Sequence, residues 1–117
     1  MLFSYKKINF KPPISVARAA EKGLAFRSEF HRGGTSVGIA RGKQLSNRET
    51  LHPTIIKRMY AYFARHEVDK KGKNFGNEEK PSNGYIAWLL WGGEPGKRWA
   101  TKLRNEMKQQ DADKNKK

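Results

Sequence analysis

Residues 83–100 read NGYIAWLLWGGEPGKRWA and contain all three tryptophans of the chain: Trp88, Trp91 and Trp99. The segment also holds the densest apolar run of the sequence, YIAWLLW. A run of about eight apolar residues is far shorter than the roughly 20 that a membrane-spanning helix needs. Tryptophan buries a large area when it is enclosed by neighbouring elements. We therefore predict one buried helix, ended by Gly92-Gly93 and restarted at Pro95, on which the rest of the chain packs.

The length of 117 residues predicts one domain, large enough to bury a core without disulfides or metal. Cysteine is absent, which excludes disulfides and Cys-ligated zinc sites and fits a cytosolic compartment. Tyr5-Lys6-Lys7 interrupts the start of the chain, so no apolar segment of signal-peptide length is expected there. No membrane-spanning segment and no lipidation motif are evident in the sequence.

The charge balance is the strongest global feature of the sequence. The chain carries 25 Lys and Arg against 11 Asp and Glu, a formal net charge of +14. Such an excess repels itself in a compact state and is normally tolerated when a polyanion is bound. Nucleic acid is the first candidate and an anionic membrane surface the second, although we expect no membrane partner. A basic surface that serves only solubility is the alternative without a partner.

The pattern along the chain predicts an all-α fold, a compact bundle of four to five short helices with an extended N-terminal arm and a disordered C-terminal tail. We expect the arm at residues 1–13, the helical domain at 14–108 and the tail at 109–117. The predicted helices cover residues 16–30, 37–45, 53–66, 83–91 and 95–108. Residues 67–81 (EVDKKGKNFGNEEKP) are predicted to form a long exposed loop.

Helix starts and inner faces can be predicted from local residues. Ser15, Thr35 or Ser36, and Ser82 or Asn83 are the expected N-caps. Gly23 weakens its helix and so indicates a close helix crossing. In the second helix, Val37, Ala40 and Leu45 are expected to point inward and Arg41 and Lys43 outward.

Two segments resemble a small module of bacteriophage proteins: residues 59–70, MYAYFARHEVDK, and residues 87–100, which include AWLLWGG and RWA. Residues 36–47 are similar to the earlier part of the module, and the resemblance covers roughly residues 14–107. The module is found in uncharacterised phage proteins, near or fused to head-assembly proteins such as prohead protease and portal-linked proteins. The resemblance implies a phage origin and a location in the host cytoplasm or the virion, but no activity. One departure is His52, where a better capping residue such as serine is expected.

No residue pattern predicts an enzyme, a metal site or a cofactor. His66, Glu67 and Asp69 form the nearest cluster, but no second histidine stands four residues from His66. We expect His66 to end its helix, where an imidazole suits the negative end of the helix dipole. The spacing of Trp88 and Trp91 favours core packing over base stacking, which would need exposed rings among cations.

The basic residues carry the functional prediction. Residues 1–48 have a net charge of +8 and residues 95–108 a net charge of +4. We predict a small, non-enzymatic phage protein that binds nucleic acid, DNA first, through phosphates with little sequence specificity. No small-molecule substrate is expected. The predicted phosphate donors are Arg32, Arg41, Lys43, Arg48, Lys57, Arg58, Lys97, Arg98 and Lys102.

Two placements of these cations stay open. In the first, the predicted helices at 16–30 and 37–45, joined by a glycine turn at Gly33-Gly34, meet phosphates, and helix N-termini add N–H donors. Alternatively, the helix at 53–66 acts as a recognition helix through Lys57, Arg58, Tyr60 and Arg65.

A structural role in the virion is the main alternative function. In that case the basic faces would meet acidic capsid, scaffold or other phage head proteins, and exposed Met59, Tyr60 or Tyr62 would belong to the interface. A small inhibitor of a host factor is a third, weaker possibility.

Overall fold

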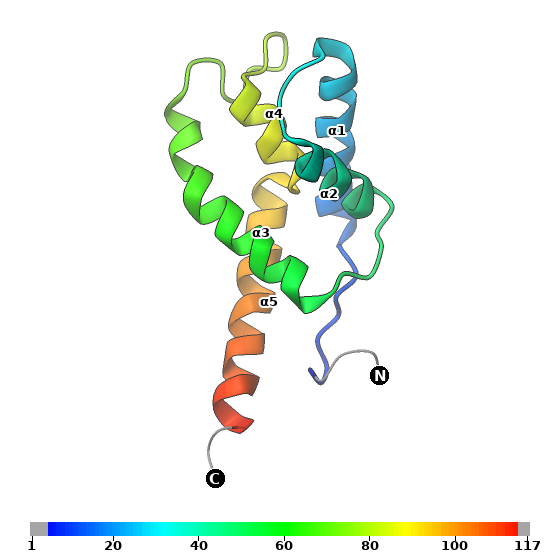
Figure 1. The fold of residues 1–117 in the computed structure, drawn as a ribbon, viewed down its shortest axis with the longest axis vertical. Helices are drawn as coiled ribbons and strands as arrows, with labels where there is room; N and C mark the ends of the chain where they lie inside the picture. The colour runs from blue at the N-terminus through cyan, green and yellow to red at the C-terminus, as the bar shows by residue number, and fades with distance from the viewer. Residues whose placement is uncertain (1–4, 115–117) are drawn as a thin grey trace.

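The computed structural model describes residues 5–114 of the chain. This part consists of five α-helices and one short 3-10 helix, and it contains no strand (Figure 1). The elements are α1 (Ile14–Phe30), α2 (Ser36–Ser46), α3 (Pro53–His66), η1 (Glu67–Lys71), α4 (Asn83–Leu90) and α5 (Gly93–Lys114). The predicted all-α bundle is therefore confirmed.

The helices pack in two groups that meet at α4 and the start of α5. Helices α1, α2 and α4 pack together, and α3 packs along α5. Helix α5 then continues past the other helices toward the end at which the arm lies (Figure 1). Among the described residues, no helix is long and apolar enough to cross a membrane.

The predicted tryptophan core is confirmed. Trp88, Trp91 and Trp99 are 2%, 9% and 8% exposed. The ring of Phe63 meets the ring of Trp88 edge-on at 4.8 Å between centroids. The ring of Tyr62 stacks on the ring of Trp91 at 4.6 Å and is almost parallel to it. Such aromatic pairs add stability beyond the area that they bury.

Local capping explains three of the helix starts. The Thr35 hydroxyl accepts a hydrogen bond from the Gly38 amide at 3.1 Å, and the Ser82 hydroxyl accepts one from the Tyr85 amide at 3.0 Å, as the sequence predicts. His52 caps α3, because its Nδ1 accepts from the Thr54 amide at 3.1 Å. The Ser15 cap is wrong: α1 begins at Ile14, after Pro13, without a side-chain cap.

Gly23 marks a close helix crossing, as predicted. A Cβ at this position would lie 2.7 Å from the backbone nitrogen of Leu90, so α1 and α4 touch almost backbone to backbone. The glycine turn after α1 lies over α4 in the same way. Gly33 and Gly34 have φ of 89° and 79°, and a side chain on either would clash with Ile86 or Leu90.

The inner face of α2 differs in part from the prediction: Leu45 is buried and Lys43 is exposed as predicted, but the other predicted positions are wrong. Val37 is 53% exposed and Ala40 is also exposed, whereas Arg41 is only 5% exposed. The buried face is set by the small residues Gly38 and Gly42, which let α2 approach α4 closely: a Cβ at Gly42 would lie 2.9 Å from Leu90 Cδ2. Turning the glycine side inward carries Arg41 with it, three residues from Gly38.

Residues 67–81 are not wholly an exposed loop. Their charged side chains are mostly exposed, but η1 orders the first part and Pro81 is buried. The ring of Phe75 meets the rings of Tyr85 and Trp88 edge-on at 5.1 and 5.9 Å between centroids. The predicted loop is therefore packed against the rest of the fold at Phe75 and at Pro81.

The predicted tail is helical through Lys114, so the predicted boundary at residue 109 is wrong; residues 115–117 lie outside the described part. The described residues of the arm run extended beside this end of α5, and residues 1–4 are again outside it. The Tyr5 hydroxyl donates to Asp111 Oδ1 at 3.0 Å, and the Lys6 amide donates to Gln110 Oε1 at 3.0 Å. These contacts from the arm hold the last turns of α5.

Candidate nucleic-acid interface

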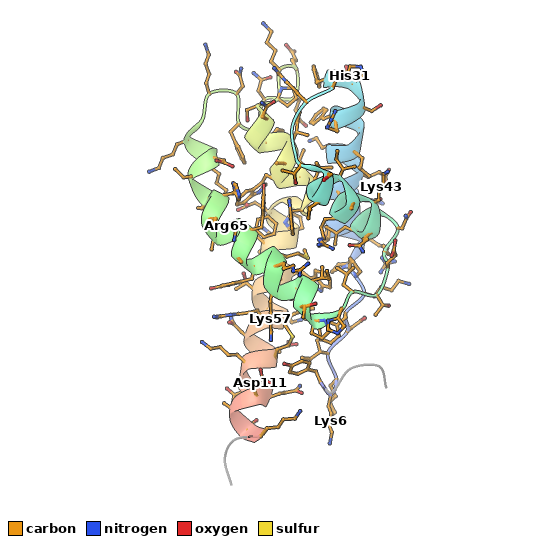
Figure 2. All side chains as sticks on the ribbon, in the orientation of Figure 1. Lys6, His31, Lys43, Lys57, Arg65 and Asp111 are labelled. Atoms are coloured by element: carbon orange, nitrogen blue, oxygen red, sulfur yellow. The ribbon has the colours of Figure 1, made fainter. Side chains whose placement is uncertain are left out.

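The nine predicted phosphate donors lie on several elements. Figure 2 labels Lys43 on α2 and Lys57 on α3, together with Arg65 farther along α3. Some of the nine side chains are exposed and make no hydrogen bond, ion pair or ring contact with any residue of the range 5–114: Lys43, Lys57, Arg58, Arg98 and Lys102. The other four, Arg32, Arg41, Arg48 and Lys97, have partners within the fold.

Arg48 and Lys102 come together in a groove between the arm and α5, which we call the arm groove. It has a volume of about 350 Å³, and its charged lining residues are Lys7, Lys11, Arg48, Lys102 and Glu106. The Arg48 Nε donates to the carbonyl of Pro12 at 2.8 Å, which holds this side chain against the arm. The arm groove thus gathers four cations against one carboxylate.

A second hollow on α5 adjoins the arm groove through Lys102, which lines both. Its volume is about 460 Å³, and its other lining residues are Glu94, Lys97, Arg98, Thr101 and Asn105. Helical spacing explains this grouping, because residues three and four apart lie on one face of a helix. The structure therefore places four of the predicted donors, Arg48, Lys97, Arg98 and Lys102, along one continuous surface.

Two cations of this surface, Lys7 and Lys11, were not among the predicted donors. The one feature of the sequence that points to these two lysines is the local excess of lysine in the arm. Their meeting with Lys102 depends on how the arm runs along α5, and local sequence does not specify that path.

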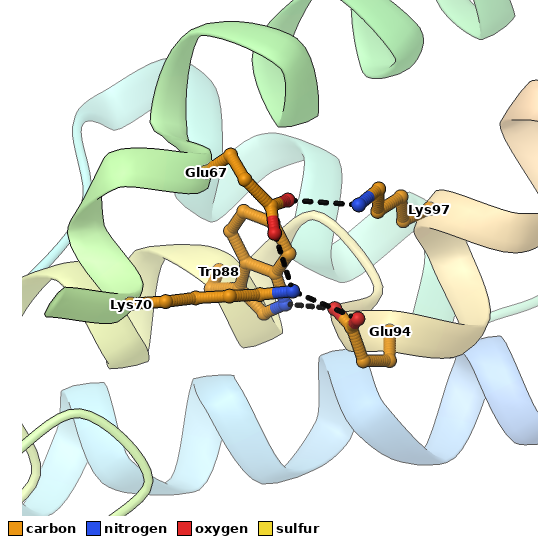
Figure 3. A network of polar contacts seen from close by, with 5 residues as sticks. All are labelled: Glu67, Lys70, Trp88, Glu94 and Lys97. Atoms are coloured by element: carbon orange, nitrogen blue, oxygen red, sulfur yellow. Dashed lines mark hydrogen bonds and ion pairs between the residues drawn. The ribbon is translucent and has the colours of Figure 1, made fainter.

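Lys97 also lies on this part of α5, but its charge is already paired. Its Nζ lies 2.8 Å from Glu67 Oε2, while Lys70 Nζ lies 2.8 Å from Glu67 Oε1 and 2.9 Å from Glu94 Oε1 (Figure 3). Glu94 also accepts a hydrogen bond from Trp88 Nε1 at 3.1 Å. Hydrogen bonds from Lys70 and then Lys97 hold the pKa of Glu67 below its ordinary value. The network ties η1 to α4 and α5.

Contrary to the prediction, Arg41 does not point outward. It is buried and therefore cannot contact a phosphate. Its guanidinium carbon lies 5.2 Å from the centre of the Trp91 ring, and its Nη1 donates to Gln44. Burial, and then the nearby charge of Arg58, lower the pKa of Arg41. Its Nε is buried without a partner. Arg41 therefore belongs to the core side of α2.

Arg32 is exposed but also has a role in the fold. Its Nη2 donates to the carbonyl of Pro81 at 3.0 Å, and its guanidinium carbon lies 5.9 Å from the centre of the Phe30 ring. The side chain thereby joins the end of α1 to the segment that precedes α4.

The basic residues of α3 divide between two hollows. Lys57 and Tyr60 line a hollow of about 330 Å³ beside α5, where Arg104 lies 4.4 Å from the centre of the Tyr60 ring. Arg58 and Arg65 line a larger cleft between α2, α3 and α4. A single recognition face on α3 would need Lys57 and Arg65 on one side of the helix, and the two hollows separate them.

Two residues expected at a protein interface in the virion alternative are buried. Met59 is fully buried and Tyr62 is 5% exposed, whereas Tyr60 is partly exposed. The apolar stripe of α3 faces α5 and the tryptophans, because the helix has only one such stripe and the core takes it.

His66 is the last residue of α3, as predicted. Its Nδ1 lies 3.0 Å from Asp69 Oδ2, and its ring stacks on the ring of Tyr62 at 4.4 Å. Across residues 5–114, no group of three or more histidine, aspartate or glutamate side chains is placed to hold a metal ion.

Comparison with protein-family models, curated proteins and solved structures finds no match for this chain. The phage resemblance of the sequence therefore stays a prediction.

Proposed function

We propose that this protein is a non-enzymatic binder of nucleic acid, with DNA as the first candidate, and that it contacts phosphates with little sequence specificity. One observation carries the proposal: in the described part of the chain no arginine forms an ion pair with a carboxylate, and only three lysines do, Lys22, Lys70 and Lys97. The positive charge is thus largely uncompensated within the fold. A polyanion is the partner that this arrangement suits.

The arm groove and the adjoining hollow on α5 are the proposed contact surface. Their unpaired cations are Lys7, Lys11, Arg98 and Lys102, and Arg48 is held beside them. Lysine and arginine side chains on a surface of this kind position a protein on the nucleic-acid backbone.

Two amide side chains of this surface are already engaged, which supports low sequence specificity. Asn9 Oδ1 accepts from the Lys11 amide at 3.0 Å, and Asn105 Oδ1 accepts from Arg104 at 3.4 Å. Reading a base edge by asparagine needs both ends of the amide free. The proposal therefore relies on charge rather than on base contacts.

A salt titration tests the proposed function. Binding of labelled duplex and single-stranded oligonucleotides is followed by fluorescence anisotropy as salt rises from about 50 to about 200 mM, a range over which backbone binders lose most of their affinity. We expect a log–log slope of several units and similar affinities for unrelated sequences. No binding at the lowest salt would refute the proposal. Capture of acidic phage head proteins by a chain that fails this test would favour the virion alternative.

A further inference from the structure

A hollow lies away from the arm groove, between α2, α3 and α4. We call it the α2–α3–α4 cleft. Its volume is about 670 Å³, within the range of small-ligand sites. Its walls are the glycine turn and first turn of α2, the residues of α3 from Arg58 to His66, and the start of α4.

An aromatic stack forms one wall of the cleft. The ring of Tyr62 lies between the rings of His66 and Trp91, at 4.4 and 4.6 Å between centroids. Arg41 covers the Trp91 ring at 5.2 Å. Because both faces of Tyr62 are occupied, a ligand in the cleft meets the edge of this ring rather than its face. Stacking of a base on Tyr62 is therefore excluded, and the polar atoms at the ring edges decide what the cleft accepts.

Two donors at these edges have no protein acceptor. Tyr62 is 5% exposed, and its buried hydroxyl makes no hydrogen bond with the described chain. Trp91 Nε1 also has no hydrogen-bond acceptor within residues 5–114, but unlike the Tyr62 hydroxyl it is not fully buried. It lies beside the first turn of α2, since a Cβ at Gly38 would be 3.4 Å from it. A buried polar group without a partner destabilises the fold. A bound group that offers acceptor oxygens would satisfy the buried Tyr62 hydroxyl and accept a hydrogen bond from Trp91 Nε1.

The surrounding charges favour an anion. The capping residue of α2, Thr35, lines the cleft, so the positive end of the helix dipole lies at the cleft wall. The first turn of α2 contains no acidic residue that would neutralise this partial charge. Arg58 and Arg65 of α3 line the same cleft. Asp69 is the one carboxylate among the lining residues. It is bonded to His66 at 3.0 Å and packs against Gly84 in the first turn of α4.

We infer that the α2–α3–α4 cleft binds a phosphate group through Tyr62, Trp91, Arg58, Arg65 and the first turn of α2. A tetrahedral phosphate offers several acceptor oxygens, and helix N-termini with flanking arginines are common hosts for it. The group can belong to a nucleic-acid strand or to a small phosphate ester. The inference does not depend on the arm groove, because none of the five cleft elements lines that groove.

The test uses the intact protein and the indole N–H signals of its three tryptophans in ¹H–¹⁵N spectra, with inorganic phosphate as the probe. Chloride at matched ionic strength is the control for screening. We expect saturable shifts of the Trp91 signal on addition of phosphate. The Trp88 signal should move less, because Trp88 Nε1 is already bonded to Glu94. A Trp91 signal that does not move, or that moves equally in chloride, would overturn the inference.

Three variants sharpen the test. Arg58→Gln and Arg65→Gln should each weaken phosphate binding about tenfold, as expected for loss of a charge-assisted hydrogen bond. Tyr62→Phe should weaken it several-fold without lowering thermal stability, because it deletes a hydroxyl that has no partner in the fold. If Tyr62→Phe instead destabilises the protein and leaves phosphate binding intact, the hydroxyl has a structural role and the assignment is wrong.

A final comparison identifies the source of the phosphate and separates this inference from the proposed function. Lys102→Gln should weaken oligonucleotide binding and leave inorganic phosphate binding unchanged. If oligonucleotides displace phosphate from the Trp91 site, the cleft takes a phosphate of the strand; if only a mononucleotide does, it takes a small ester. Oligonucleotide binding without any phosphate effect at Trp91 would refute the cleft and keep the proposed function. A phosphate effect at Trp91 without oligonucleotide binding would refute the proposed function and keep the cleft.

Discussion

The guanidinium of Arg41 covers the ring of Trp91 at 5.2 Å, so a cation of α2 closes one side of the aromatic stack. The charge is buried and one of its donors, Nε, has no partner. Burying a charge is costly, whereas the stem of an arginine packs like an apolar side chain.

The first prediction therefore separates the packing of Arg41 from its charge. Arg41→Ala should lower the free energy of unfolding by about 1–3 kcal/mol, because it leaves a cavity beside Trp91. Arg41→Met, of similar length, should be close to neutral or stabilising, since it removes a buried charge without a carboxylate partner. Denaturant unfolding measures both. Equal losses for the two variants would show that the charge itself stabilises the stack.

The second prediction concerns the crossing of α1 and α4. Gly23→Ala gains about 1 kcal/mol of helix propensity but forces a Cβ to within 2.7 Å of the Leu90 backbone nitrogen. Because the obstacle is backbone, the helices must separate, and the net result should be a loss of about 1–3 kcal/mol. Ser28→Ala, at an exposed position of the same helix, is the control and should change stability little. Stabilisation by Gly23→Ala would contradict the close packing.

The third prediction compares cations of α5 in DNA binding. Lys102→Gln and Arg98→Gln should each lower the log–log salt slope by about one, the expected effect of losing one phosphate contact. Lys97→Gln is the matched control on the same helix. It should change the slope less, because Glu67 already neutralises Lys97 at 2.8 Å. An equal effect of all three substitutions would indicate a response to total charge rather than to a defined surface.

The fourth prediction concerns the network around Glu67. The pKa of Glu67 is held below 4.5 by hydrogen bonds from Lys70 and then Lys97. A lowered folded-state pKa contributes stability that is complete above the ordinary value and is lost as pH falls through the lowered one. Glu67→Gln should thus lower stability at neutral pH and reduce the further loss on acidification. The difference should be at most about 1 kcal/mol, since the side chain is 46% exposed.

Unfolding curves of the wild type and Glu67→Gln at neutral pH and below pH 4.5 measure this difference. Glu79→Gln is the control, because Glu79 is exposed and forms no ion pair in the described part of the chain. The same acid dependence in all three proteins would contradict a contribution from the network.

Local chemistry made much of the fold predictable. Thr35 and Ser82 cap their helices through atoms three residues away, and the tryptophan spacing at 88 and 91 defines a buried face. Such features depend on neighbours within one or two turns. The sequence alone is enough to locate them.

The errors arose where a distant element decides the outcome. The inner face of α2 is set by side chains of other elements, chiefly Leu90, which pack against Gly38 and Gly42 and leave Val37 outside. The polar composition of the last turns of α5 suggested disorder. These turns are held by contacts from the arm, which lies about 100 residues away in the sequence and which composition does not reveal.

The candidate site was predictable to the same limited extent. The sequence identified the basic residues but not the arm groove, because Lys7, Lys11 and Lys102 meet only through the path of the arm. The α2–α3–α4 cleft was missed altogether. Its two unpartnered donors come from Tyr62 and Trp91, which sequence patterns assign correctly to the core.

The contact between Tyr5 and Asp111 joins positions that are 106 residues apart, and it lies with Lys6 at one end of the molecule (Figure 2). During translation Tyr5 leaves the ribosome long before Asp111 has been synthesised. We therefore expect the arm to dock last, since closing so large a loop is entropically slow. Pulse-labelled hydrogen exchange during refolding should find late protection near Gln110, and early protection there would contradict this order. Until α5 has been synthesised, Lys7 and Lys11 have no helix beside them, so the arm groove can form only after that point.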